Sequence, residues 1–193
     1  MSKKIIILSQ PKAGTYLCAN LLQELGFGFY GYHLGRKKYH KYPPPTDPLF
    51  QMALRDPKHV EYKIRLKESI KSIAEGSFAV SHLIYNPTTE SLLQGFHKIC
   101  ITRPENEIFD SLKRWEKATG RPPANMIPTV ARIHGVAKWI GRANVFHITY
   151  NDMKNCNVDK IDQLQQFLGL TNPMHSKQLC DRALKRDSKT KIT

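Results

Sequence analysis

The stretch Ile5-Ile6-Ile7-Leu8-Ser9-Gln10-Pro11-Lys12-Ala13-Gly14-Thr15 decides the fold of this chain. Its first four residues form a continuous aliphatic run, which is typical of a central parallel strand covered on both faces. After the polar turn, leucines recur at helical spacing between residues 17 and 25, and Gly26 is a natural helix end. The opening therefore predicts a strand, a tight turn and a helix.

The same alternation continues along the chain. Short apolar runs predict further strands at 78–81, 98–102 and 145–149. Apolar residues at helical spacing predict helices at about 57–75, 88–95, 105–119, 128–142 and 158–168. Strands that alternate with helices predict an α/β fold of three layers, α/β/α, with a mainly parallel central sheet. We expect a single domain over residues 1–193.

Two segments depart from this pattern. Residues 27–48 are rich in Gly, Tyr, His, Lys and Pro, and they predict an irregular insertion within the domain. Residues 172–193 are basic and weakly patterned, and they predict a C-terminal tail.

Charge and composition narrow the possible partners. Thirty Lys and Arg residues against 16 Asp and Glu residues give a net charge of +14, which suits polyanionic partners. No apolar run reaches the length of about 20 residues that a membrane span needs. The apolar run near the amino terminus is also too short for a signal peptide, so we expect a cytoplasmic protein.

The four cysteines form no C-x-x-C pair, so a zinc ribbon or a thioredoxin-type motif is disfavoured. Cys18 and Cys100 lie inside apolar patterns and are expected to be small buried side chains. This usage fits a reducing compartment.

The first strand exit has the features of an anion site. Backbone N–H groups and the positive end of the dipole meet at the start of the following helix, and Gly14 lets an anion approach the backbone. Lys12 adds a charge and Thr15 a hydroxyl. The pattern G-x-x-x-x-G-K-[ST] is absent because Lys12 precedes the glycine, so an ordinary ATP-binding P-loop is disfavoured.

A later strand exit supplies a second cation. Arg103 follows the strand at 98–102, and its planar set of donors suits a phosphate. Ser111 lies eight residues later, about two turns into the next helix. If the turn at Pro104 folds the helix back towards the strand end, we expect both side chains to face one phosphate. An ion pair for Arg103 and a solvated position for Ser111 are the alternatives.

Together the two motifs resemble the sulfotransferases that use 3′-phosphoadenosine 5′-phosphosulfate (PAPS). The resemblance runs in order from about residue 4 to 170 and rests on five segments: Pro11–Thr15, Val80–Leu83, Arg103–Ser111, Ile148–Met153 and Phe167–Leu170. It implies a P-loop NTPase-like sulfotransferase architecture. It also implies transfer of a sulfuryl group to a hydroxyl or amine, with 3′-phosphoadenosine 5′-phosphate (PAP) as the product and no metal.

The resemblance assigns roles residue by residue. Lys12 and His82 are the implied catalytic residues, with His82 as general base. The implied cofactor-binding residues are Pro11, Lys12, Ala13, Gly14, Thr15, Tyr16, Arg103 and Ser111. Two departures stand out, since Val80 replaces a lysine usual in cytosolic members and the closing Arg-Lys-Gly loop is missing. Only a basic tail with Lys185, Arg186, Lys189 and Lys191 stands in its place.

Other interpretations stay open at this stage. His33, His40 or Glu24 are the alternative bases. The sequence does not identify the acceptor: a carbohydrate and a small molecule are both compatible with it, and the basic charge suits an anionic one. Tyr30, Tyr32, Tyr39 and Tyr42 either stack on the acceptor or cover the core. We expect Tyr150 and Asp152 to anchor the sheet end, and Trp115 and Trp139 to pack helices.

Two other function classes compete with the sulfotransferase. A nucleotide or nucleoside kinase needs magnesium and a lysine after the loop glycine. The second class is a basic nucleic-acid-binding module, in which the basic and aromatic residues 36–42 would contact the nucleic acid. A nucleic-acid partner is the less favoured interpretation.

Overall fold

The computed structural model describes residues 3–34, 70–71, 73–120 and 130–190 of the chain. Five strands form a sheet in the order β2-β3-β1-β4-β5, and every neighbouring pair is parallel. Their bounds are β1 Ile5–Ser9, β2 Gly28–Leu34, β3 Ser77–Ser81, β4 His97–Thr102 and β5 Val145–Thr149.

The central strand β1 is buried on both faces. Its first four residues have no exposed surface, as the continuous aliphatic run predicts. Ile5 and Ile7 point into one hydrophobic cluster, whereas Ile6 and Leu8 point into a second. The alternation divides the core into two layers, one on each side of the sheet.

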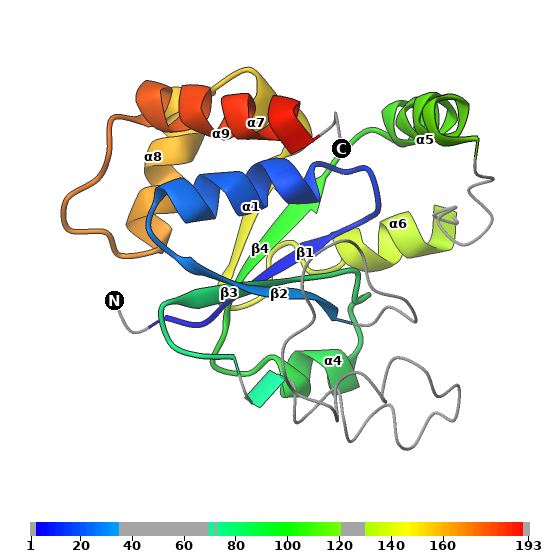
Figure 1. Ribbon diagram of the computed structural model, residues 1–193. Helices are drawn as coiled ribbons and strands as arrows, with labels where there is room; N and C mark the ends of the chain where they lie inside the picture. The colour runs from blue at the N-terminus through cyan, green and yellow to red at the C-terminus, as the bar shows by residue number, and fades with distance from the viewer. Residues whose placement is uncertain (1–2, 35–69, 72, 121–129, 191–193) are drawn as a thin grey trace.

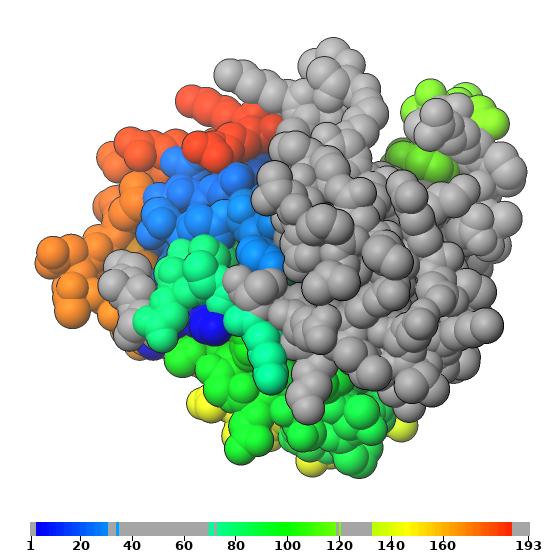
Figure 2. Space-filling model, turned by 60° about the horizontal axis from the view of Figure 1, so that its bottom comes forward, coloured from blue at the N-terminus to red at the C-terminus, as the bar shows by residue number. Residues whose placement is uncertain are grey.

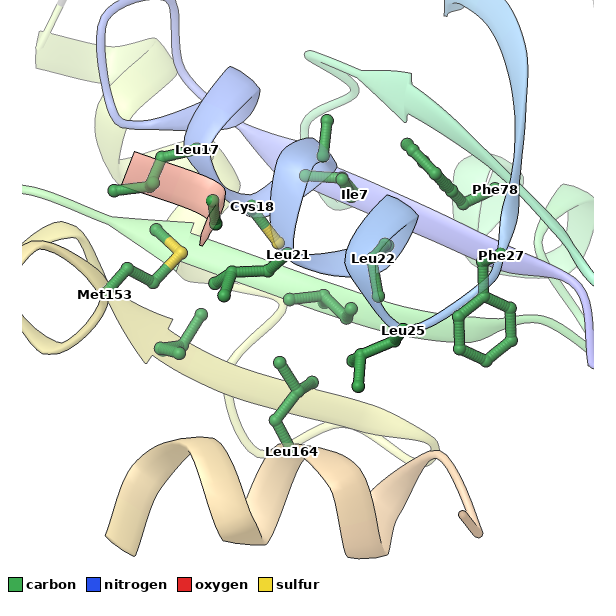
Figure 3. Close-up of a cluster of buried hydrophobic side chains, with 14 of the residues drawn as sticks. Ile7, Leu17, Cys18, Leu21, Leu22, Leu25, Phe27, Phe78, Met153 and Leu164 are labelled. Atoms are coloured by element: carbon green, nitrogen blue, oxygen red, sulfur yellow. The ribbon is translucent and has the colours of Figure 1, made fainter. Parts of the chain in front are cut away.

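Four helices cover the first face of the sheet (Figure 1): α1 Thr15–Glu24, α7 Tyr150–Lys154, α8 Val158–Phe167 and α9 Ser176–Thr190. Leu17, Leu21 and Leu22 of α1 point down onto the strands, and Leu164 of α8 meets the same cluster from another side (Figure 3). Helix α9 packs against α1 and lies beside the blue N-terminal part of the surface in Figure 2.

The second face is covered by α4 Pro87–Leu92 and α6 Val130–Ala137. Trp139, just after α6, is completely buried, and its indole N–H donates to the carbonyl oxygen of Leu83 at 3.1 Å. Trp139 is therefore a packing residue, as predicted. The layers on both faces confirm the three-layer α/β/α fold with a parallel central sheet.

Helix α5, Glu105–Thr119, begins just beyond the carboxyl end of β4. Its Ile108 and Leu112 pack on Ala13, forming a small separate cluster. This packing brings α5 over the loop that follows β1.

Several segments differ from their predictions. Residues 28–34, expected to be irregular, form the edge strand β2, and the tail predicted at 172–193 contains helix α9. Residues 150–154 form the short helix α7, which the periodicity did not predict, and they are held by a capping box between Thr149 and Asp152. Most of the helix predicted at 57–75 lies outside the described residues, and its predicted end at 73–75 is not helical. The helix predicted at 128–142 ends earlier, at Ala137, and its residues 128–129 lie outside the described residues.

The predictions for the buried cysteines are confirmed. Cys18 and Cys100 have no exposed surface, and burial raises the pKa of each thiol to about 12. Within the described parts of the chain, no helix has the length and apolar character needed to cross a membrane.

Candidate functional site

The candidate site lies at the carboxyl edge of the sheet. Because all the strands are parallel, the residues after each strand meet at this edge. The chain leaves β1 for β2 on one side and later returns to β4 on the other side, which makes β1 the topological switch point. Ligands of open α/β sheets bind in the crevice at such a point.

The loop after β1 has a backbone that few residues adopt. Lys12 has φ 65° and Gly14 has φ 100°, so both lie in the left-handed region. A Cβ atom at Gly14 would lie 2.6 Å from Cδ2 of Tyr150, so glycine is needed there both for its conformation and for space. A left-handed lysine costs free energy, and such residues cluster at functional sites.

The start of α1 is electrically positive. Its N-cap residue, Gly14, provides no side-chain cap, and the first turn of the helix contains no acidic residue. The N–H of Ala13 donates to the carbonyl of Gln10 at 3.1 Å and closes the turn. The hydroxyl of Thr15 is buried and lies 2.6 Å from that of Ser9, while Tyr16 is 37% exposed.

Lys12 lies against an aromatic side chain of α5. Its Nζ atom is 5.0 Å from the ring centroid of Trp115, which is a cation–π distance. Trp115 was expected to pack between helices. The structure instead places this half-buried ring beside the loop cation.

His82 follows β3 and is anchored on β1. Its Nδ1 atom lies 2.6 Å from the carbonyl oxygen of Ser9. Because a carbonyl only accepts hydrogen bonds, Nδ1 carries the proton and Nε2 is the basic nitrogen of the neutral ring. The same bond would hold a packing histidine, but here it also selects the tautomer that a general base needs.

Arg103 follows β4 and is held by three contacts. Its Nε donates to Oε2 of Glu107 at 3.0 Å, and Nη1 donates to the carbonyl oxygen of Lys12 at 2.9 Å. The guanidinium carbon lies 3.9 Å from the ring centroid of Tyr150. The hydrogen bond from Arg103 is the main reason why the pKa of the Glu107 carboxyl lies below its usual value.

Ser111 lies on the face of α5 that turns toward the loop. It is four residues from Glu107 and four from Trp115, so the three side chains follow one another along one side of the helix. Glu107 contacts Arg103 and Trp115 contacts Lys12, so Ser111 lies between two positions that face the site. Ser111 itself is half-buried.

Several other candidates lie away from this edge or outside the described residues. The described residues do not include the segment 36–42, which contains Tyr39, His40 and Tyr42. They also do not include the side chains of Tyr32, His33, Lys189 and Lys191. Glu24 lies in the last turn of α1 and forms an ion pair with Arg186 of α9. Tyr30 packs on the second core cluster, and Lys185 is exposed.

Sequence reasoning missed three partners of the expected site residues. Glu107 is spaced four residues from Arg103, a helical pairing distance that the sequence displays. Trp115 contacts Lys12 from 103 residues later, and no local pattern indicates such a contact. Tyr150 is expected only to anchor the sheet end. Its ring also stacks on the guanidinium of Arg103 and lies so close to Gly14 that a Cβ atom would not fit there.

A metal centre is not apparent in the described part of the chain. No group of three or more His, Cys, Asp or Glu side chains gathers there in a way that could hold an ion.

Comparison with known proteins shows the fold. The chain matches no family model and no curated protein sequence. It resembles the crystal structure of mouse sulfotransferase SULT7A1 complexed with PAP, with a TM-score of 0.59 and 16% identity over 94% of this chain and 63% of that one. It also resembles retinol dehydratase in complex with androsterone and the inactive cofactor PAP, with a TM-score of 0.59 and 13% identity over 93% of this chain and 64% of that one.

These likenesses confirm the sulfotransferase fold that the sequence motifs imply. The chain spans less than two thirds of the length of either solved structure.

Proposed function

We propose that this protein transfers the sulfuryl group of PAPS to a hydroxyl or amine of an acceptor molecule. The observation that carries the proposal is the hydrogen bond from His82 Nδ1 to the Ser9 carbonyl. It holds an imidazole with a basic Nε2 beside the loop that bears Lys12. A proton acceptor and a loop cation thereby meet at the switch point of a sulfotransferase fold.

The phosphosulfate end of the donor binds at the start of α1. The amides of residues 14–16 and the positive helix end attract the anion, and no acidic residue in the first turn opposes it. The left-handed Gly14 permits a close approach of the backbone. Lys12 supplies the mobile charge.

The 3′-phosphate binds at Arg103 and Ser111. The two hydrogen bonds of Arg103 involve Nε and Nη1, and the planar fork has further N–H donors that can contact a phosphate. The stack on Tyr150 uses only the face of the guanidinium. The residues present therefore fit a doubly phosphorylated nucleotide, with Glu107 as a competing anion at Arg103.

Transfer is an in-line displacement. The acceptor oxygen or nitrogen forms a bond to sulfur while the bond from sulfur to the 5′-phosphate oxygen breaks. His82 Nε2 takes the proton of the acceptor, and the Lys12 ammonium stabilises the negative charge that grows on the departing oxygen. Positioning and electrostatic stabilisation provide most of the rate, as in phosphoryl transfer.

Thermal unfolding with added nucleotides tests the proposal. A ligand that binds only the native state stabilises it by about 2.7 kcal/mol at a hundredfold excess over its Kd. PAP should therefore raise the melting temperature more than AMP, and both more than ATP with magnesium. Equal shifts from PAP and AMP would remove the 3′-phosphate site, and a shift from ATP with magnesium alone would favour a kinase.

A further inference from the structure

Arg103 joins the two ends of the proposed nucleotide site. The residue belongs to the proposed 3′-phosphate site, yet its Nη1 atom donates to the carbonyl oxygen of Lys12, 91 residues earlier in the chain. Lys12 is part of the loop proposed to hold the phosphosulfate. A single charge-assisted hydrogen bond thus connects the exits of β4 and β1.

This hydrogen bond fixes one particular peptide group. The carbonyl of Lys12 and the N–H of Ala13 belong to the same planar unit. Arg103 holds the oxygen at 2.9 Å, and the carbonyl of Gln10 holds the N–H at 3.1 Å. A rotation of this peptide, which changes ψ of Lys12 and φ of Ala13, would break both bonds. The pair therefore holds the turn of residues 10–13, in which Lys12 has its left-handed φ of 65°.

The guanidinium is itself held in place by the protein. Glu107 accepts from Nε at 3.0 Å, and the Tyr150 ring lies 3.9 Å below the guanidinium carbon. Only 10% of the Arg103 side chain is exposed. The hydrogen bond to the loop is therefore present before any nucleotide arrives.

We propose that Arg103 is a positioning residue for the loop after β1 as well as a phosphate ligand, so that the two ends of the site are coupled. The inference rests on the proposed function where it concerns nucleotides. Because Arg103 holds the Lys12 peptide, the loss of Arg103 weakens binding at the loop even for a ligand with no 3′-phosphate. Linkage makes the coupling reciprocal.

Calorimetry with AMP tests the coupling, because AMP has no 3′-phosphate. In Arg103→Lys the charge remains but the planar fork is lost, so a purely long-range electrostatic role predicts unchanged AMP affinity. We expect AMP to bind about tenfold more weakly, the loss of one hydrogen bond to a charged group. The matched control is Ser111→Ala, which should weaken PAP but leave AMP within about twofold.

A measurement without nucleotide separates this inference from the proposed function. We expect amide hydrogen exchange in residues 9–17 to be several-fold faster in Arg103→Lys than in the unmodified protein, with α8 at 158–167 as the internal reference. If neither AMP nor PAP binds the unmodified protein, the proposed function fails, but the exchange result still decides the role of Arg103.

A second variant keeps the test decisive if Arg103→Lys does not fold. Glu107→Gln retains Arg103 but removes the charge that holds Nε. Faster exchange in residues 9–17 of this variant would support the inference. Unchanged exchange in that segment in whichever variant folds, together with unchanged AMP affinity in it, would overturn the inference.

Discussion

The two sides of β1 carry different kinds of side chain at the carboxyl edge. On the β3 side, His82 presents a half-buried imidazole anchored at Nδ1 by the carbonyl of Ser9. On the β4 and β5 side, Arg103 carries a permanent charge, held by Glu107, the Lys12 carbonyl and the Tyr150 ring. A histidine such as His82 can exchange a proton near neutral pH, whereas the guanidinium of Arg103 cannot.

This difference predicts which residues affect the reaction rate and which affect nucleotide affinity. A group that contacts the 3′-phosphate, whose charge does not change in the reaction, contributes equally to ground-state and transition-state binding, so Arg103 should govern affinity. A group that takes up a proton during the reaction governs the rate. Lys12, on the loop between the two sides, should contribute to both. Substitutions on each side should therefore separate into rate effects and affinity effects.

The largest expected effect is on the β3 side. In His82→Ala, transfer should fall by about 10²–10⁴-fold because the general base is lost, while PAP affinity stays within about twofold. Turnover with a hydroxyl acceptor and calorimetry with PAP measure the two quantities. The matched control is His175→Ala, an exposed histidine before α9, which should leave both unchanged.

Full transfer activity in His82→Ala would contradict the division between the two sides. The search for the base would then move to His33 or His40, the alternatives that the sequence leaves open. Glu24 would be the weaker choice, because it is paired with Arg186.

The next effect concerns Lys12. In Lys12→Ala, transfer should fall by about 10²–10³-fold because charge on the leaving oxygen loses its partner, and PAP affinity should also drop. Lys12→Arg should recover little of the rate, since a planar fork does not replace a compact ammonium in this loop. Slow hydrolysis of PAPS without an acceptor gives an independent readout, and an unchanged hydrolysis rate in Lys12→Ala would refute the role.

A smaller effect is expected on the β4 side, and it concerns affinity. Arg103→Ala should lower PAP affinity by about 1.5–3 kcal/mol, and Ser111→Ala by about 0.5–1.5 kcal/mol, because the Arg103 donor is charged and can be bidentate whereas the Ser111 hydroxyl is neutral. Calorimetry with PAP compares the two. If Arg103→Ala bound PAP as tightly as the unmodified protein, Arg103 would not be a ligand of the 3′-phosphate.

Much of the fold could be predicted because its central strands are uninterrupted apolar runs. β1, β4 and β5 begin and end within a residue of the predicted positions. The edge strand β2 lacks such a run, since its sequence is Gly-Phe-Tyr-Gly-Tyr-His-Leu. It is held on β3 partly by stacking of Phe29 on Phe78 at 5.0 Å, a contact that spans 49 residues and leaves no local pattern.

The candidate site divides in the same way. The loop after β1 and the residues that follow β3 and β4 are predictable, because strand ends and glycine positions are local features. The contact of Lys12 with Trp115 and the stack of Arg103 on Tyr150 are not, because they depend on how α5 and α7 pack over the edge. Sequence reasoning therefore identified the two cations, Lys12 and Arg103, but not the aromatic rings that contact them.

The smallest effect tests whether the β4 and β5 side is stable without nucleotide. His147 on β5 lies 2.7 Å, through Nε2, from the hydroxyl of Thr102 on β4. Burial, with a smaller contribution from Lys160, holds the pKa of His147 below its usual 6.5. The pKa of His97, at the start of β4, is lowered for the same main reason.

The sign of the pH dependence follows from proton binding. A histidine with a lowered folded-state pKa binds fewer protons in the native state than in the unfolded state, so stability rises with pH across that window. The contribution is complete above pH 6.5 and is lost as the pH falls through the unfolded-state pKa toward the folded-state pKa.

Urea midpoints between about pH 5 and pH 8 should therefore decline on the acid side. In His147→Gln the decline should become shallower, and the part that remains should come from His97. In His175→Gln, which replaces an exposed histidine, the decline should be unchanged. An identical slope in His147→Gln and the unmodified protein would show that the β4–β5 contact does not depend on a neutral His147.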